Sequence, residues 1–264
     1  MWVGVIALGL IAAAFGYGLA YASKKFTVEL HPKVDEVLKV LPHANCGACG
    51  LAGCKAFAEA VVAGKVPVDG CVPGQKKVAN KIGEILGKKV EAKEAKKAQL
   101  YCNGNKQNCP DKFDYEGIES CKAAVLIGCG QKGCDYGCLG FGDCVKVCPF
   151  DAIAMGKDGL PKIDKEKCTG CAKCVKNCPK GILHLAPEKS KVHVRCSSKD
   201  PAIIVTKACK VGCIACKQCE KACPVDAIHV IDNLAVIDYS KCVSCGKCVT
   251  VCPRKIIEKV EVKV

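Results

Sequence analysis

The sequence predicts a small, loop-rich α+β fold that is divided into modules and preceded by one membrane-spanning helix. Three observations predict it. The 264 residues include 26 cysteines but only 5% aromatic residues, two similar blocks recur at an offset of 75 residues, and residues 2–22 carry no charge. So many thiols beside so few aromatic side chains indicate that bound metal, rather than a large apolar core, holds the modules together.

The uncharged run at residues 2–22 predicts a transmembrane helix, because about 20 apolar residues cross the hydrocarbon core of a bilayer. The alternative is a cleaved signal peptide, since residues 20–22 read Ala-Tyr-Ala. No basic residue precedes the run, and the run is longer than a signal-peptide core, so we favour an anchor. Lys24 and Lys25 then place the remainder of the chain in the cytoplasm.

Composition divides the chain into five parts. We expect a membrane anchor at 1–23, a near-membrane domain at 24–90, a linker with a cysteine-containing insert at 91–133, and two modules at 134–190 and 191–264.

Short elements are predicted inside these parts. Apolar periodicity predicts a helix over 55–63 and a second helix from 75, with Val78, Ile82, Ile85 and Leu86 on one face. The Lys-, Ala- and Glu-rich stretch at 91–99 predicts a linker, and β-prone runs lie at 227–230 and 235–237.

The strongest chemical signal is the run C-x2-C-x2-C-x3-C-P, which is the ligand pattern of bacterial ferredoxins with [4Fe-4S] clusters. It occurs three times: at Cys168, Cys171, Cys174 and Cys178; at Cys213, Cys216, Cys219 and Cys223; and at Cys242, Cys245, Cys248 and Cys252. Zinc also binds four thiolates, but its motifs pair two C-x2-C knuckles across a gap. The runs therefore favour iron–sulfur clusters over zinc.

In such a pair of runs the fourth cysteine of each run binds the cluster of the other. This rule predicts one site at Cys213, Cys216, Cys219 and Cys252, and a second at Cys242, Cys245, Cys248 and Cys223. The first module departs from the run, because its first quartet is spaced Cys134-x3-Cys138-x5-Cys144-x3-Cys148. We still expect sites at Cys134, Cys138, Cys144 and Cys178, and at Cys168, Cys171, Cys174 and Cys148.

A different pattern, C-x2-C-x4-C-x16-C, lies closest to the membrane segment, at Cys46, Cys49, Cys54 and Cys71. Glycines between these cysteines let backbone N–H groups approach a cluster, and four thiolates with dense glycine favour a fifth [4Fe-4S] cluster over a zinc knuckle.

Six cysteines remain: Cys102, Cys109, Cys121, Cys129, Cys196 and Cys209. The first four form no recognised spacing, and the residues leave open whether they bind a sixth cluster or are plain thiols. We expect the last two, which flank Ile203-Ile204-Val205, to be buried thiols.

The formal charge of +14 does not indicate nucleic-acid binding. Each oxidised [4Fe-4S] cluster with four thiolates carries about −2, so five clusters reduce the sum to about +4 (14 − 5×2). Gly128 to Gly133 match G-x-G-x-x-G, but a Cys/Gly loop follows instead of a βαβ unit, so no dinucleotide site is expected. No acid–base or nucleophile constellation is evident, and we assign no catalytic residue to this chain.

The order of these features resembles the B subunit of the Rnf complex in its long form. The resemblance covers nearly the whole chain and rests on LPHANCGACGLAGC from Leu41, FDYEGI from Phe113, KGCDYGCLGFGDCVKVCPFDAI from Lys132 and CPVDAI from Cys223. It implies a subunit of a membrane-bound, Na⁺- or H⁺-translocating ferredoxin:NAD oxidoreductase.

The resemblance also implies partners. Soluble ferredoxin would dock on this subunit, which would relay electrons to membrane subunits, while NAD, flavins and the ion path belong to other subunits. The alternatives are a polyferredoxin relay in a hydrogenase or formate-linked membrane complex, and a structural zinc or nucleic-acid-binding protein.

Overall fold

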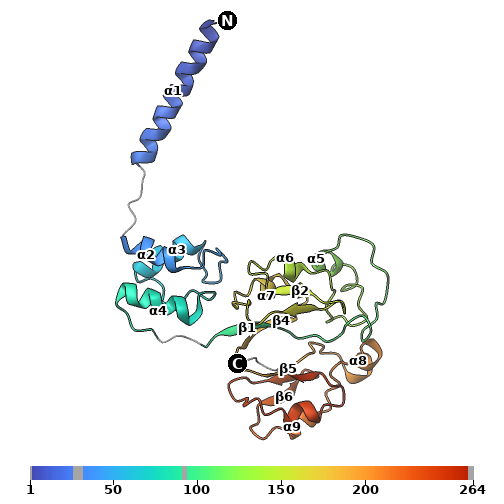
Figure 1. Cartoon of the computed structure of the whole chain (residues 1–264). Coiled ribbons are helices and arrows are strands. Elements are labelled where there is room, and N and C mark those ends of the chain that lie inside the picture. Colours follow the sequence, from blue (N-terminus) through green and yellow to red (C-terminus); the bar gives the residue numbers. More distant parts are fainter. Residues whose placement is uncertain (1, 26–31, 91–93, 261–264) are drawn as a thin grey trace.

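The structure is a computed structural model that describes residues 2–25, 32–90 and 94–260. Figure 1 shows a long N-terminal helix, a small helical domain and two α+β modules that lie against each other. Mixed helix and strand content agrees with the predicted α+β class.

The N-terminal helix α1 (Trp2–Lys25) is long and apolar enough to cross a membrane. No described side chain of its apolar window is buried by the protein, and Lys24 and Lys25 form its last turn. Basic residues suit a helix C-terminus because they compensate the helix dipole. A fully exposed apolar surface of this length needs lipid or a partner around it.

The near-membrane domain consists of three helices, α2 (Pro32–Val40), α3 (Cys54–Val62) and α4 (Gln75–Leu86). Their apolar faces meet in one core around Val37, Phe57 and Ile82. The helices predicted over 55–63 and from 75 are confirmed, and α4 ends at Gly87, which adopts φ 67° as helix-terminating glycines do.

The first module contains three short helices and four strands: α5 (Cys121–Ala124), α6 (Asp143–Lys146), α7 (Lys173–Asn177), β1 (Lys96–Leu100), β2 (Ile153–Met155), β3 (Pro161–Ile163) and β4 (Leu183–Pro187). The second contains α8 (Ala202–Ala208), α9 (Gln218–Lys221), α10 (Lys247–Thr250), β5 (Val192–Val194), β6 (Ile228–Ile231), β7 (Leu234–Ile237) and β8 (Ile257–Lys259).

All named strands pair in antiparallel couples, β1 with β4, β2 with β3, β5 with β8 and β6 with β7. The strands predicted at 227–230 and 235–237 are confirmed as the β6–β7 hairpin. In the described part of the chain these antiparallel pairs form no βαβ unit.

Strand β1 corrects the expected linker at 91–99. Lys96 pairs with Pro187 and Leu100 with Leu183, so β1 completes the outer sheet of the first module as β5 does in the second. The module therefore begins well before residue 134. Sequence alone missed the strand because Lys-Lys-Ala-Gln-Leu has little β propensity, and its burial comes from β4 and from the Cys168 loop of the first module. Residues 91–93 lie outside the described part of the chain.

Candidate iron–sulfur sites

Two cavities in the second module are each lined by four cysteines. One, of about 330 Å³ with its open mouth included, is lined by Cys213, Cys216, Cys219 and Cys252. The other, of about 340 Å³, is lined by Cys223, Cys242, Cys245 and Cys248. The structure thus brings together both predicted sets, including the exchange of the fourth cysteine between runs.

The backbone of each run curls around its cavity. The residues on either side of the second cysteine have positive φ: Ala215 and Lys217 in one run, Ser244 and Gly246 in the next. A short helix begins after each, at α9 and α10. Two left-handed residues turn the chain sharply, so three thiols of one run face a common centre.

Burial is the main influence on these thiols. It raises the pKa of Cys219 to about 11, with the nearby thiolates of Cys213 and Cys216 adding to the shift. It raises the pKa of Cys248 to about 11 for the same reasons. A buried thiolate needs a positive centre to be stable, and the iron atoms of a cluster supply it.

In the first module, Cys168, Cys171, Cys174 and Cys148 are also neighbours. Burial raises the pKa of Cys174 to about 12, and the thiolates of Cys168, Cys171 and Cys148 contribute to the increase. Strand β1 covers this site from outside: the Ala98 N–H points to Cys168 Sγ at 3.4 Å.

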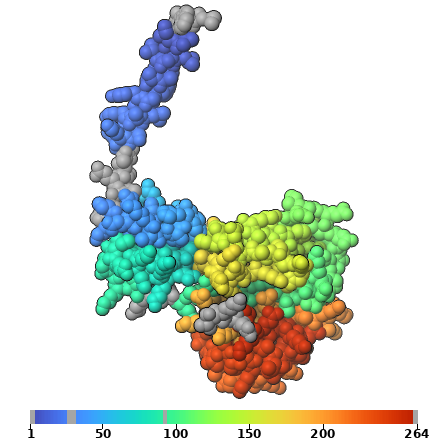
Figure 2. Space-filling view, in the orientation of Figure 1, coloured from blue at the N-terminus to red at the C-terminus, as the bar shows by residue number. Residues whose placement is uncertain are grey.

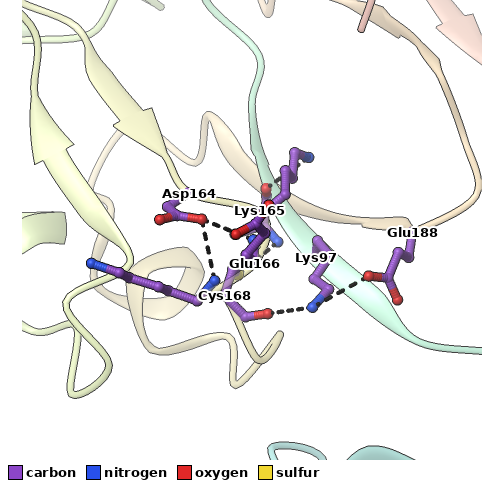
Figure 3. Close-up of polar contacts among 8 residues, drawn as sticks. Lys97, Asp164, Lys165, Glu166, Cys168 and Glu188 are labelled. Carbon is purple, nitrogen blue, oxygen red and sulfur yellow. Dashed lines mark hydrogen bonds and ion pairs between the residues drawn. The ribbon is translucent and has the colours of Figure 1, made fainter. Parts of the chain in front are cut away.

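Figure 3 shows the polar contacts of that cover. Lys97, which is buried, donates to the carbonyl oxygen of Cys168 at 2.7 Å and pairs with Glu188 at 3.4 Å. The carboxylate of Asp164 accepts the N–H of Glu166 at 2.8 Å and so shapes the turn that leads into Cys168. β1 therefore places both an N–H donor and a positive charge beside this run.

The near-membrane domain gathers Cys46, Cys49, Cys54 and Cys71. Burial raises the pKa of Cys71 to about 11, and the thiolates of the other three raise it further. The loop is closed by Asn45, whose side-chain oxygen accepts the Cys54 N–H at 2.8 Å. This predicted set is also brought together.

The near-membrane site faces the first module. The Cys46 thiolate is close enough to Cys171 to contribute to the raised pKa of Cys171, after burial. Figure 2 shows the surface of the near-membrane domain in contact with that of the first module.

The structure corrects the set predicted at Cys134, Cys138, Cys144 and Cys178. A cavity of about 400 Å³ is lined by Cys138, Cys144 and Cys178, as predicted, but its fourth cysteine is Cys121 rather than Cys134. Cys134 lies instead near Cys109 and Cys102. Sequence reasoning passed over Cys121 because its spacing from the neighbouring cysteines matches no recognised ligand pattern.

In the described part of the chain, no three His, Cys, Asp or Glu side chains are close enough to bind one metal ion together. A zinc ion requires thiolates about 2.3 Å from one centre, whereas a four-iron cluster holds them farther apart. In a four-iron cluster each thiolate binds its own iron atom, so four cysteines that do not converge on a single metal position suit a cluster better than a zinc ion.

Comparison with known proteins agrees with this chemistry. Residues 41–73 match the family described as "Putative Fe-S cluster", and residues 127–182 and 212–256 match the 4Fe-4S dicluster domain. The chain thus matches an Fe-S family before the insert and 4Fe-4S dicluster domains from residue 127 onward.

Three relatives match over most of their length. The B subunit of the Na⁺-translocating ferredoxin:NAD⁺ oxidoreductase complex of Acetobacterium woodii is 46% identical over 95% of this chain and 75% of its own. The B subunit of the ion-translocating oxidoreductase complex of Methanosarcina acetivorans is 46% identical over 96% of each chain. The B subunit of the proton-translocating ferredoxin:NAD⁺ oxidoreductase complex of Clostridium ljungdahlii is 48% identical over 90% of this chain and 84% of its own. The chain therefore belongs to the family of Rnf complex B subunits.

Proposed function

We propose that this chain is the electron-relay subunit of a membrane-bound, ion-translocating ferredoxin:NAD oxidoreductase. It accepts electrons from soluble ferredoxin and passes them to membrane subunits of the same complex. The observation that carries the proposal is the series of four-cysteine sites, which extends from the second module through the first to the near-membrane domain.

The proposal gives the cysteines one role. The sets at Cys46, Cys168, Cys213 and Cys242 and the set around Cys138 hold [4Fe-4S] clusters, which supply one-electron transfer when bound. The chain's own residues hold each cluster with thiolates, screen it from water by burial, and direct backbone N–H groups at its sulfurs. NAD reduction and ion transport are left to other subunits.

Location follows from the first helix. In the proposal α1 is a single-pass anchor in the cell membrane, and Lys24 and Lys25 keep the cluster domains on the cytoplasmic side. The near-membrane site then lies closest to the membrane subunits. Cys46, which is near Cys171, marks the passage from the modules to that site.

The test uses membranes from cells that lack this chain, complemented with the wild type, Cys46→Ala or Cys129→Ala. We expect reduced-ferredoxin-dependent NAD reduction with the wild type and with Cys129→Ala, whose thiol lines none of the cavities described above. Cys46→Ala is expected to abolish the activity and to remove one cluster's signal by electron paramagnetic resonance.

Undiminished NAD reduction in membranes without the chain would overturn the proposal. Co-purification with hydrogenase or formate dehydrogenase subunits would instead assign the same relay chemistry to a different complex.

A further inference from the structure

The first run of the first module is a standard ferredoxin run with one ligand missing. At the offset of 75 residues, Cys138, Phe141, Cys144 and Cys148 align with Cys213, Cys216, Cys219 and Cys223. The backbone agrees, because Gly140 and Gly142, on either side of Phe141, have positive φ like the residues on either side of Cys216. Phe141 therefore occupies the place of the second cysteine, and Cys134 lies outside the run.

Cys121, from a segment earlier in the chain, lies beside Phe141, where the second cysteine of the run is missing. Its thiol accepts the backbone N–H groups of Asp143 and Phe141, and it lines the cavity with the three remaining cysteines. Ser120 fixes this position, since its hydroxyl donates to the Asp143 carboxylate at 2.8 Å and joins the start of α5 to the start of α6.

A second group of cysteines meets around Gly104. A Cβ atom on this glycine would lie 3.6 Å from Sγ of both Cys102 and Cys209, and 3.2 Å from Cβ of Cys109. The thiols of Cys109 and Cys209 are hydrogen-bonded to each other, and the Cys109 thiol also accepts the Cys134 N–H. Four cysteines from distant parts of the chain thus converge on one place.

The 75-residue repeat supports this grouping. Cys134 and Cys209 are equivalent, each four residues before the first cysteine of its run. Backbone hydrogen bonds join the segments that carry the group: Gly133 N–H donates to Pro110 at 2.9 Å, and Lys210 N–H donates to Asn108 at 2.8 Å. Cys196 has in the second module the contact that Cys102 has in the first: its sulfur accepts the Cys213 N–H at 3.4 Å, as Cys102 accepts the Cys138 N–H. Cys102 is the one that meets Cys109 and Cys209 around Gly104.

Positive charge surrounds the same group. The buried Lys132 donates to the Cys109 carbonyl at 3.0 Å, and Arg254 donates to the Cys209 carbonyl at 2.6 Å. Arg195 lies near the Cys102 thiol. Arg195 and Arg254 are the only arginines of the sequence, and the Nε of each is buried without a hydrogen bond in the described structure. Two carboxylates also lie here, since Arg195 Nε pairs with Glu258 at 3.7 Å and Lys132 pairs with Asp111 at 3.2 Å. Buried cations of this kind offset the negative charge of a four-thiolate cluster.

We propose that Cys102, Cys109, Cys134 and Cys209 hold a sixth [4Fe-4S] cluster, and that Cys121 completes the site of Cys138, Cys144 and Cys178. The inference rests on the proposed function, because it takes the other sites to hold clusters. Cys102 accepts the N–H of Cys138 in the first module, and Cys209 leads into Cys213 in the second. The sixth site therefore lies between the modules, where a bound cluster would supply one-electron transfer from one to the other.

Iron and acid-labile sulfide per full-length chain, purified anaerobically in detergent, test the sixth site. We expect about 24 irons in the wild type and in the control Cys129→Ala, and about 20 in Cys109→Ala and in the size-matched Cys209→Ser. Circular dichroism and the remaining 20 irons show that the variants fold.

About 20 irons in the wild type and in Cys109→Ala alike would overturn the inference while leaving the proposed function intact. A Cys109–Cys209 disulfide found by mass spectrometry, or a zinc ion lost in Cys109→Ala, would also overturn it. A wild type with almost no iron would overturn the proposed function itself.

The replacement of the second cysteine of the run by Cys121 can be tested by rescue. Cys121→Ala is expected to lose about four irons, and the double variant Cys121→Ala/Phe141→Cys is expected to regain them, because the second-cysteine position is restored. Cys134→Ala is expected to lose about four irons that Phe141→Cys does not restore. The opposite pattern, with rescue of Cys134→Ala and full iron in Cys121→Ala, would return Cys134 to the Cys138 site.

Discussion

Gly170, in the run Cys168-Thr169-Gly170-Cys171, is where strand β1 approaches the iron–sulfur loop most closely. Its φ is 72°, and a Cβ atom there would lie 2.1 Å from the carbonyl oxygen of Lys96. The conformation alone does not require glycine, because Ala215 occupies the equivalent position of the next run at φ 54°. The close approach of β1 does.

Gly170→Ala is therefore expected to displace β1. An alanine in the left-handed region costs about 1–2 kcal/mol. To restore van der Waals contact the Lys96 carbonyl must move by about 1 Å, which weakens the bond from Lys97 to the Cys168 carbonyl and the N–H···S contact from Ala98. At about 1 kcal/mol for the neutral bond and about 2 kcal/mol for the charged one, the added cost is about 3 kcal/mol.

Gly181→Ala is the matched control, because Gly181 belongs to the same module, has φ 60°, and has no atom within 4 Å of an added Cβ. The assay is thermal bleaching of the cluster absorbance in full-length protein. Gly170→Ala is expected to bleach at a clearly lower temperature than Gly181→Ala, which carries only the conformational cost. Equal bleaching temperatures would refute the close packing of β1 on the loop.

Three further predictions concern other parts of the fold. Phe57 is 1% exposed in the core of the near-membrane domain, so Phe57→Ala leaves a cavity there and is expected to lower the free energy of unfolding by about 3–5 kcal/mol. In a chelator-dependent bleaching assay the near-membrane site is expected to lose its iron before the sites of the two modules. Burial lowers the pKa of His193 to about 4. The unfolded chain then binds a proton that the folded chain does not between pH 6.5 and 4, so stability falls as pH falls, by about 1.4 kcal/mol at pH 5.5. His193→Gln is expected to flatten the urea-unfolding stability curve over that window, and an unchanged slope would contradict this. Lys97→Met removes a buried positive charge beside Cys168. In a redox titration it is expected to lower the reduction potential of one cluster by about 60 mV, which corresponds to about 1.4 kcal/mol. An unchanged potential would show that the charge is screened.

The sequence by itself determined the chemistry and most of the local structure. The cysteines of a ferredoxin run lie within a few residues of one another, so Cys213, Cys216 and Cys219 could be predicted as one set from the sequence. The exchange that brings Cys252 to this set could be predicted in the same way. The apolar run that forms α1 and the apolar face that buries Ile82 were equally evident, because both depend on residues close together in the chain.

Only the tertiary structure decided which distant segments meet. Strand β1 exists because β4 and the Cys168 loop bury a sequence with no β propensity of its own. Cys121 reaches its cavity through the contact between Ser120 and Asp143, and Cys134 joins Cys109 and Cys209 because the two modules fold against the insert. Periodicity and spacing report contacts within a few residues, whereas these ligands are set by packing between segments that lie up to about 100 residues apart in the chain.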